Sequence, residues 1–307
     1  MECAICKVTN PLVLKEKFQA YSLWHCQNCA GQFWTPMKNP GSDWYQHDER
    51  YAWRNKNPYQ FVESNHQEFL SDLPAPHGTL LDIGMGTGNF LKAALGYGYQ
   101  GYGIDFDEEA VRVARESLGL KNIYAADIDG ALRQFGANYF NSITMFEVLE
   151  HLENPNDFME KVKILLKSGG FLALSVPYRN SWDRFKKYDK PPRHLTRWDK
   201  NSLSKFLSRH QFNVVRLKVI PVSLSYLITK FHFWTTGLLS FGLVQKISAS
   251  RATSKSSLLA SPAIKLARFT ARFKDYLLFF VPSLLLYCYL ALIKKHGLTL
   301  YSLAKRN

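Results

Sequence analysis

Residues 80–91 of the chain are Leu80-Leu81-Asp82-Ile83-Gly84-Met85-Gly86-Thr87-Gly88-Asn89-Phe90-Leu91. A short apolar run contains an acid near its end, three glycines follow at every second position, and a helical pattern then begins. This order predicts a strand, a tight turn and the start of a helix. Glycine permits positive φ and lets a ligand approach the bare main chain, and the first turn of a helix presents unpaired N–H groups. The stretch therefore predicts a turn that holds part of a nucleotide-like cofactor.

The segments after this turn alternate between helical and strand-like patterns. We expect strands at residues 79–83, 102–104, 122–126, 142–146 and 171–176. We expect helices at residues 89–97, 108–118, 131–135 and 155–166, the last of them ended by Gly169 and Gly170. A helix at 201–209 and strands at 212–218 and 298–304 complete the pattern. Such alternation indicates a parallel, doubly wound α/β sheet, which binds its ligands at the carboxyl ends of the strands.

Acidic residues lie at or near the ends of the expected strands, namely Asp82, Asp105, Asp127 and Glu147. The glycines have the spacing G-x-G-x-G, whereas a dinucleotide fingerprint has G-x-G-x-x-G. Asp105 follows Gly84 by 21 residues, where an acid accepts hydrogen bonds from ribose hydroxyls, and Asp127 could accept one from an adenine amino group. These features fit S-adenosylmethionine better than NAD.

With these motifs, the chain resembles the class I S-adenosylmethionine-dependent methyltransferases. The matching segments are residues 81–88, 103–105, 126–128 and 146–152, in that order. The segment 191–198 and the N-terminal cysteines resemble a zinc-ribbon branch common in bacterial polysaccharide and secondary-metabolite pathways. The resemblance implies a Rossmann-like, doubly wound, mostly parallel sheet of seven strands.

The resemblance also implies a role for each motif residue. Gly84, Gly86 and Gly88 would approach the methionine and ribose of the cofactor, and Asp82 would help to hold the methionine amino group. Asp105 would bind the ribose hydroxyls. The side chain of Asp127 and the backbone of Ile128 would bind adenine, and Glu147 would lie under the methionine end, near the transferred methyl group.

Four of the five cysteines form two Cys-x-x-Cys pairs, Cys3 with Cys6 and Cys26 with Cys29, separated by nineteen residues. Such pairs can close a tetrahedral Cys₄ zinc site. Two disulfides or chance spacing are the alternatives, and disulfides are rare in the cytosolic compartment that we expect for this chain. We therefore expect a closed, structural Zn²⁺ site. Cys288 lies in an apolar run, which predicts a small buried side chain.

His151 and His194 are the candidate catalytic residues, because histidine is well suited to remove a proton from an acceptor hydroxyl at neutral pH. The alternative is that each only caps a helix or stabilises a loop. The set Glu147-x-x-Glu150-His151 also resembles the one with which ubiquinone-pathway and small-RNA 2′-O-methyltransferases use a divalent metal, so Mg²⁺ or Mn²⁺ is a further candidate.

Charge is distributed unevenly: residues 1–160 carry 12 Lys+Arg and 21 Asp+Glu (net −9), whereas residues 161–307 carry 27 and 4 (net +23). The basic half indicates an anionic partner, or else only a generally basic surface. Residues 276–293 are eighteen residues without charge. This stretch could be a membrane span, a buried helix or a helix embedded in a membrane surface. We favour the last because basic residues lie nearby, namely Lys265, Arg268, Arg272 and Lys274.

Four parts are expected: a zinc ribbon (1–38), a linker and helical lead-in (39–75), a methyltransferase core (76–218 with 297–307) and a helical, basic and apolar insertion (219–296). We expect a cytoplasmic enzyme, peripheral on the inner face of a membrane, that methylates a small-molecule, glycan or lipid-linked acceptor at oxygen. The alternatives are an RNA methyltransferase, although no RNA-binding module is recognised, and a non-catalytic scaffold docked on the membrane. The sequence does not indicate the acceptor or the oligomeric state.

Overall fold

A computed structural model describes residues 1–9, 11–41, 44, 47–48, 55, 63–72, 78–181, 189–228, 279–293 and 296–307. The chain divides into two compact units, residues 1–220 with 298–307, and residues 221–297. The division into four parts stays a prediction. The four basic residues near the uncharged stretch lie outside the described residues.

A seven-stranded sheet forms the centre of the first unit, with the strand order β10-β11-β8-β7-β4-β5-β6. Its strands are β4 (Thr79–Ile83), β5 (Gln100–Asp105), β6 (Ile123–Ala125), β7 (Phe140–Phe146), β8 (Leu166–Pro177), β10 (Phe212–Pro221) and β11 (Gly297–Arg306). The strands from β8 to β6 pair in parallel, and β11 runs antiparallel to β8. The expected mostly parallel α/β fold is therefore confirmed, and the strand order reverses between β4 and β7, where open sheets bind ligands.

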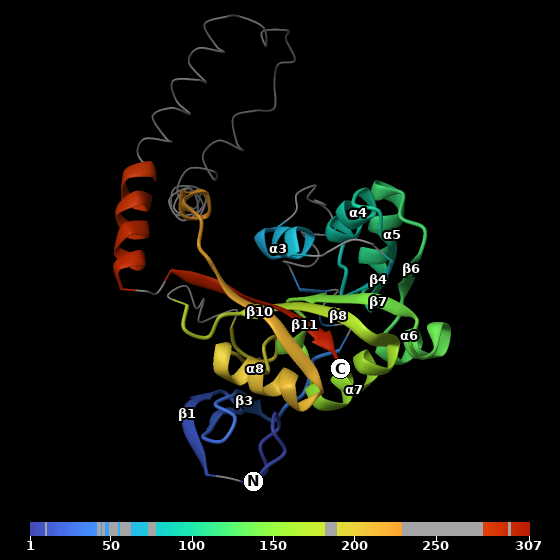
Figure 1. Ribbon diagram of the computed structural model, residues 1–307. Coiled ribbons are helices and arrows are strands. Elements are labelled where there is room, and N and C mark those ends of the chain that lie inside the picture. Colours follow the sequence, from blue (N-terminus) through green and yellow to red (C-terminus); the bar gives the residue numbers. More distant parts are fainter. Residues whose placement is uncertain are drawn as a thin grey trace, which may run out of the picture. The chain divides into compact units, whose positions relative to one another are not determined.

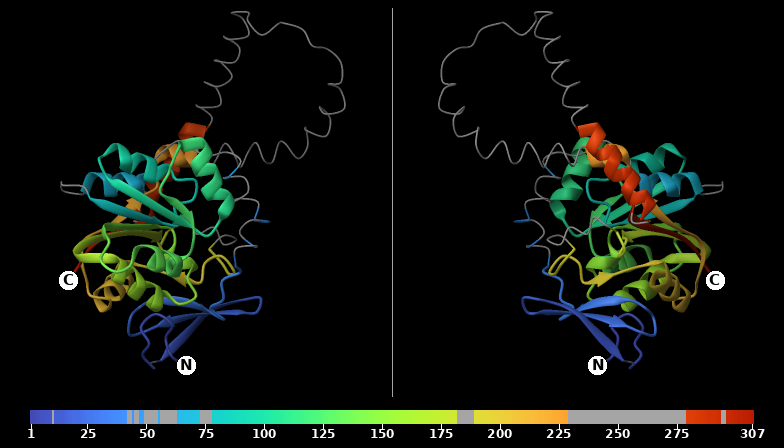
Figure 2. Two further views of the ribbon diagram at one scale, coloured as in Figure 1. Left: turned by 90° about the vertical axis from the view of Figure 1, so that its right-hand side faces the viewer. Right: turned by 90° about the vertical axis from the view of Figure 1, so that its left-hand side faces the viewer.

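Helices cover both faces of this sheet (Figures 1 and 2). On one face lie α3 (Ser64–Asp72), α4 (Asn89–Gly96) and α5 (Glu108–Leu118), and on the other lie α6 (Ile128–Phe135), α7 (Pro155–Leu165) and α8 (Lys200–Arg209). The adjacent residues Leu80 and Leu81 are both fully buried and belong to different apolar clusters. Successive side chains of a strand point to opposite faces, so one short strand supplies both cores.

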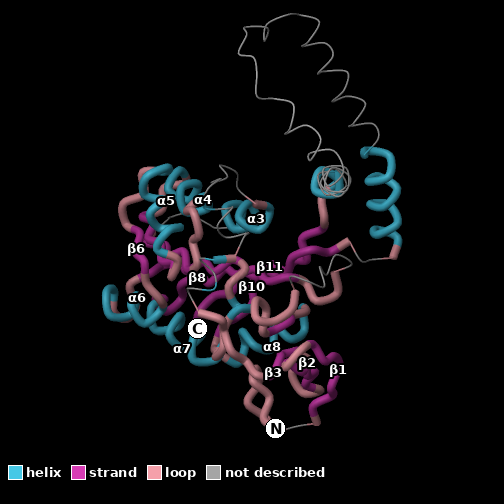
Figure 3. Tube along the Cα trace, turned by 180° about the vertical axis from the view of Figure 1, so that it is seen from behind, coloured by secondary structure: helices cyan, strands magenta, loops and turns pink. Residues whose placement is uncertain are grey.

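A smaller sheet of four strands has the order β1-β2-β3-β9, and of the N-terminal cysteines only Cys26 lies in one of its strands. The first three strands are β1 (Leu12–Phe18), β2 (Tyr21–Cys26) and β3 (Gln32–Thr35), and they lie next to α8 (Figure 3). The fourth strand, β9 (Thr196–Arg197), comes from the segment that follows β8. We call residues 1–35 the ribbon. The ribbon sheet is thus completed by a strand from the methyltransferase-like part of the chain.

The expected end of the fourth helix is wrong. Helix α7 ends at Leu165, β8 begins at once, and Gly169 and Gly170 lie inside that strand. The pairing of β7 with β8 is irregular there, because Phe140 pairs with Leu166 whereas Ser142 pairs with Phe171. Gly169 has a φ of 71°. The glycines therefore lie in an irregular part of the strand, where four residues of β8 stand opposite one residue of β7.

Residues 279–292 of the second unit are helical. Ser283 and Leu290 are buried, and their spacing of seven residues places them on one stripe of a helix. Cys288 lies off this stripe and is exposed, so the expectation of a buried thiol is wrong. Within the described part of the chain, we find no helix with both the length and the apolar character needed to cross a membrane.

Candidate functional site

The glycine turn joins β4 to α4. Gly84, Gly86 and Gly88 have φ values of 70°, 54° and 78°, which side-chain-bearing residues rarely adopt. A Cβ atom on Gly84 would lie 2.6 Å from a methyl of Val148, and one on Gly88 would lie 2.4 Å from a methyl of Leu120. Gly88 is the N-cap of α4 and has no side chain to bond the first N–H groups of the helix. The turn therefore requires glycine and presents main-chain donors.

Asp105 ends β5 beside this turn and is 7% exposed. Its Oδ2 accepts a hydrogen bond from the N–H of Gly86 (2.8 Å), and its Oδ1 accepts one from the N–H of Asp107 (2.9 Å). Asp107 in turn caps α5 and accepts a hydrogen bond from the side chain of Asn55 (2.9 Å). The carboxylate of Asp105 is thus held in one orientation against the glycine turn.

Asp82 lies within β4, one residue before its end, and is nearly fully buried. Its Oδ1 accepts a hydrogen bond from the hydroxyl of Thr144 on β7 (2.8 Å). Burial, together with the negative charge of Asp105, raises the pKa of Asp82 to about 7 against the lowering effect of the hydrogen bond from Thr144. Asp82 is therefore a carboxyl group whose charge changes near neutral pH.

The third strand end has another arrangement. Asp127 is exposed and caps α6, where its side chain accepts a hydrogen bond from the N–H of Gly130 (2.8 Å). The side chain of Ile128 is buried in the core. An adenine-binding role of Asp127 and of the Ile128 backbone stays a prediction.

Glu147 follows β7 with a φ of 55°, in the left-handed region that is strained for its residue type. Its Oε1 accepts a hydrogen bond from the hydroxyl of Ser175 (2.9 Å), which in turn accepts one from the amide of Asn65 on α3 (2.9 Å). Burial raises the pKa of Glu147 to about 7, and Glu63 contributes to the rise. Such strain and shifted pKa values are common at functional sites.

Sequence analysis missed Asn65, His66 and Ser175. His66 packs its ring against Phe90 (centroids 5.2 Å apart) and Phe146 (4.8 Å), and burial lowers the pKa of this imidazole to about 4. Ser175 had a visible signal, since it is a polar residue inside an apolar strand. The sequence around Asn65 and His66 contains no such signal, because the contacts of these two residues depend on where α3 packs.

His151 and His194, which are 43 residues apart in the sequence, lie side by side with ring centroids 4.9 Å apart. Nδ1 of His151 lies 2.7 Å from the carbonyl oxygen of Arg193, and its Nε2 lies 3.8 Å from a carboxyl oxygen of Glu150. A carboxyl oxygen of Glu150, a ring nitrogen of His151 and a ring nitrogen of His194 lie within 4.8 Å of one another. We call these three residues the acceptor-side cluster.

Glu150 is the buried member of this cluster, with a side chain that is 1% exposed. Neither of its carboxyl oxygens accepts a hydrogen bond from an N–H or hydroxyl donor among the described residues, and its neighbour is a second carboxyl group, that of Glu147. Burial raises the pKa of Glu150 well above its usual range, with further contributions from Glu147 and Asp189. A buried carboxylate without such a donor is costly, so this geometry suits a group that binds a proton, a cation or a ligand hydroxyl.

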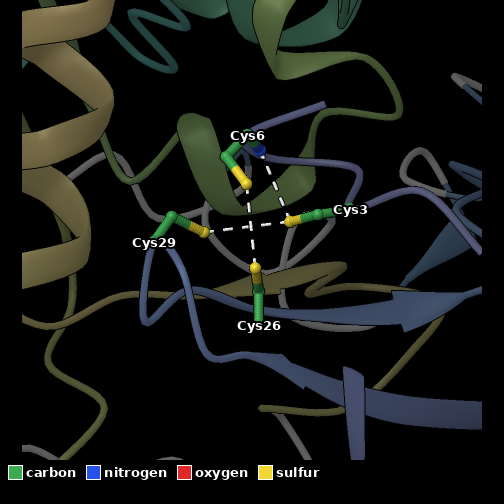
Figure 4. Close-up of side chains that lie close together, drawn as sticks. All are labelled: Cys3, Cys6, Cys26 and Cys29. Carbon is green, nitrogen blue, oxygen red and sulfur yellow. Dashed lines mark hydrogen bonds between the residues drawn. The ribbon is translucent and has the colours of Figure 1, made fainter. Parts of the chain in front are cut away.

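The four ribbon cysteines converge on one point (Figure 4). Sγ of Cys3 lies 3.8 Å from Sγ of Cys29, and Sγ of Cys6 lies 3.7 Å from Sγ of Cys26. A tetrahedral ion with metal–sulfur bonds of about 2.3 Å separates its sulfurs by about 3.8 Å, whereas a disulfide needs about 2.05 Å. All four thiols are free and buried. The cluster could therefore hold a metal ion, and the disulfide alternative does not fit.

A family model described as "Methyltransferase domain" matches residues 43–217, more than half of the chain. The chain belongs to this family.

Curated relatives match a shorter part of this methyltransferase. A ubiquinone biosynthesis O-methyltransferase of Shewanella sp. (strain ANA-3) is 30% identical over 104 residues, which cover 33% of this chain and 44% of the relative. Another, from Glaesserella parasuis, is 36% identical over 109 residues, which cover 33% and 46%. The chain thus spans less than half the length of the curated relatives that it matches.

Solved structures share the fold at low identity. A SAM-dependent methyltransferase from Archaeoglobus fulgidus has a TM-score of 0.53 and 15% identity, with 84% of this chain and 100% of that chain covered. A phosphoethanolamine N-methyltransferase of Haemonchus contortus, in complex with S-adenosyl-L-methionine, has a TM-score of 0.53 and 15% identity, with 86% and 59% covered. This member of the methyltransferase family therefore has the fold of S-adenosylmethionine-dependent methyltransferases.

The residues at the strand ends fit this cofactor, whose sulfonium supplies an electrophilic methyl group. The left-handed glycine turn admits a ligand against its main chain, and Asp105 presents a fixed carboxylate beside it. Asp82 offers a second acid, suited to an ammonium group. Methyl transfer is a displacement that depends on proximity and alignment. The strand ends therefore offer groups that could hold such a donor, and they are different residues from those of the acceptor-side cluster.

Proposed function

We propose that this methyltransferase transfers the methyl group of S-adenosylmethionine to a hydroxyl oxygen of a small-molecule, glycan or lipid-linked acceptor. The observation that carries this proposal is the acceptor-side cluster, in which a buried carboxyl group that accepts no hydrogen bond from a described N–H or hydroxyl donor lies beside two imidazoles. A hydroxyl must lose its proton as its oxygen attacks, and a neutral imidazole is a suitable base. The partial similarity to ubiquinone O-methyltransferases supports the same atom type.

The same cluster supports a divalent cation as a helper of acceptor binding. One carboxylate and two imidazoles form an oxygen and nitrogen donor set that suits Mn²⁺ or Mg²⁺. With a cation bound, Glu150 would be held ionised by the cation's charge. The cation would orient adjacent acceptor hydroxyls and lower their pKa, and the two histidines would then act as ligands instead of bases.

The test is transfer of tritiated methyl groups into host extract separated into small-molecule, glycan, lipid and RNA fractions. We expect label in one of the first three fractions, resistant to mild alkali, which removes methyl esters, and released by boron tribromide, which cleaves methyl ethers. Glu150→Gln is expected to lower transfer at least about 100-fold and to leave S-adenosylmethionine binding within about threefold. Label only in RNA would replace this proposal with the RNA-methyltransferase alternative, and S-adenosylmethionine binding without label in any fraction would favour the scaffold.

Binding of S-adenosylmethionine is expected to depend on pH through Asp82. Only its carboxylate form can pair with the ammonium group of the ligand, and its pKa is raised to about 7 by burial. Below pH 7 the ligand must displace a proton, so affinity is expected to fall up to about tenfold per pH unit. Calorimetric titration between pH 5.5 and 7 measures this slope. Asp82→Asn keeps the shape of the side chain, and an unchanged slope in that variant would contradict the assignment.

We propose Zn²⁺ as the metal of the ribbon, because four thiolates at tetrahedral spacing are its usual structural site. Zinc measured by elemental analysis of purified protein is expected near one equivalent. Iron in its place would contradict this choice.

We further propose that the enzyme binds the surface of an anionic membrane through the helix at 279–292. Large apolar side chains on it are exposed, with Leu285 at 67%, Tyr289 at 57% and Leu292 at 81%. Apolar insertion and the basic charge of the C-terminal half both favour such a surface. Sedimentation with vesicles that contain phosphatidylserine tests this, and full retention in the supernatant at low salt would contradict it.

A further inference from the structure

The loop that contains His194 is attached to the ribbon by main-chain hydrogen bonds. Strand β9 pairs with β3, with Arg197 opposite Gln32 and Thr196 opposite Phe33. The carbonyl oxygen of Leu195 accepts a hydrogen bond from the N–H of Trp34 (2.8 Å), and the N–H of Leu195 donates one to the carbonyl oxygen of Glu150 (2.7 Å). A single residue therefore joins the ribbon to the buried acid of the acceptor-side cluster.

The side chains of the same loop form a second connection. One carboxyl oxygen of Asp189 lies 3.3 Å from Nδ1 of His194, and the other lies 2.7 Å from Nε of Arg197. The guanidinium of Arg197 also donates a hydrogen bond to the carbonyl oxygen of Asp189 (3.0 Å). The side chains of Asp189 and Arg197 are 12% and 6% exposed, so solvent screens this ion pair little.

The ribbon contacts Arg197 directly. Its guanidinium lies 5.3 Å from the ring centre of Trp34, and one of its nitrogens lies 3.4 Å from a carboxyl oxygen of Glu16 on β1. The other carboxyl oxygen of Glu16 lies 2.8 Å from Nζ of Lys190, the neighbour of Asp189. One ribbon carboxylate thus pairs with two cations of the loop.

This arrangement selects one tautomer of His194. A carboxylate beside Nδ1 favours the form with the proton on Nδ1, which leaves the lone pair of Nε2 for a proton or a metal ion. His151 has an equivalent arrangement, because its Nδ1 lies against a carbonyl oxygen. In both imidazoles of the cluster, Nε2 is then the ring nitrogen that can accept a proton or bind a metal ion.

We propose that Asp189 and Arg197 are positioning residues that fix the tautomer and orientation of His194. Glu16 and Trp34 of the ribbon contact Arg197 and thereby hold it in place. The ribbon is then part of the acceptor site without touching the acceptor. This inference rests on the proposed role of His194, but its test needs neither an acceptor nor a divalent cation.

The first test is long-range ¹H–¹⁵N NMR of protein labelled with ¹⁵N-histidine, at a pH where the imidazoles are neutral, with His194→Gln used for assignment. In the wild-type protein we expect the Nδ1–H tautomer of His194 to exceed the other at least about tenfold. In Asp189→Asn we expect the amide oxygen of the new side chain to face the guanidinium of Arg197. The amide NH₂ then faces His194, and the Nε2–H tautomer is expected to become the major form.

His210 provides a matched control, because its Nδ1 lies 2.8 Å from a carboxyl oxygen of Glu160, distant in sequence from the His194 loop. Glu160→Gln is expected to change the signals of His210 and to leave those of His194 unchanged. An unaltered His194 tautomer in Asp189→Asn would overturn the role of Asp189.

The second test addresses the ribbon. Glu16→Gln removes the charge shared by Lys190 and Arg197, and we expect hydrogen exchange at residues 195–197 to quicken at least about fivefold. Unchanged exchange would overturn the role of Glu16. If both tests succeed and no hydroxyl acceptor is methylated, then the acceptor proposal fails and the positioning role stands.

Discussion

Asp105→Ala is expected to weaken the binding of S-adenosylmethionine at least about 100-fold. The carboxylate is held at the end of β5 by the N–H groups of Gly86 and Asp107, and we propose that it also accepts hydrogen bonds from the ribose hydroxyls of the cofactor. Each hydrogen bond to a charged group contributes about 1.5–3 kcal/mol, so two ribose hydroxyls correspond to about 3 kcal/mol or more, and every 1.4 kcal/mol is tenfold in affinity. Calorimetric titration measures the change directly.

Two further variants test whether the loss of affinity is specific to the carboxylate of Asp105. Asp157→Ala removes an aspartate whose side chain is 55% exposed and pairs with Lys161 on the surface, where such pairs contribute little, and it is expected to bind like the wild-type protein. Asp105→Asn keeps one oxygen acceptor and is expected to lie between the two. Wild-type affinity in Asp105→Ala would show that the cofactor does not use this acid.

The sequence predicted most of the parallel sheet because its signals are local. The stretch from Leu80 to Leu91 contains a strand, a turn and a helix start whose roles are decided by glycine conformation and by apolar patterning. The alternation of elements after it then leaves few topologies. The end of α7 was not predicted correctly because Gly169 and Gly170 lie where the pairing of β8 with β7 is irregular. Pairing between strands is not a local property of the sequence.

The site was predicted less completely, for the same reason. Asp82, Asp105 and Glu147 could be proposed one by one from their places at strand ends. The proximity of His151 and His194 depends on how the segment after β8 returns to the sheet, and the roles of Asn65 and Asp189 depend on packing across more than one element. Residue type and spacing therefore suffice to propose the acids at the strand ends, whereas the contacts around His194 require the folded structure.

Cys26→Ala is expected to unfold the ribbon while leaving the cofactor site in place. The ribbon has about 35 residues, and chains below about 40 residues rarely fold without a metal, disulfides or a partner. A structural zinc ion contributes on the order of 10 kcal/mol to such modules, and the fully buried Cys26 is one of the four cysteines that could hold it. Metal content is expected to fall to near zero, and hydrogen exchange at residues 12–35 to quicken at least about 100-fold.

The consequences for the rest of the enzyme separate two roles of the ribbon. Strand β9 loses its partner β3, so His194 is expected to lose its fixed orientation and methyl transfer to fall at least about tenfold. The glycine turn is supported by β4 and β5, so S-adenosylmethionine affinity should change less than about threefold. Cys288→Ala, which removes the exposed thiol of the other unit, is the matched control and should change none of these quantities. If the affinity for S-adenosylmethionine disappeared together with the metal, the ribbon would belong to the donor side, and its pairing with the His194 loop would be a consequence of that role.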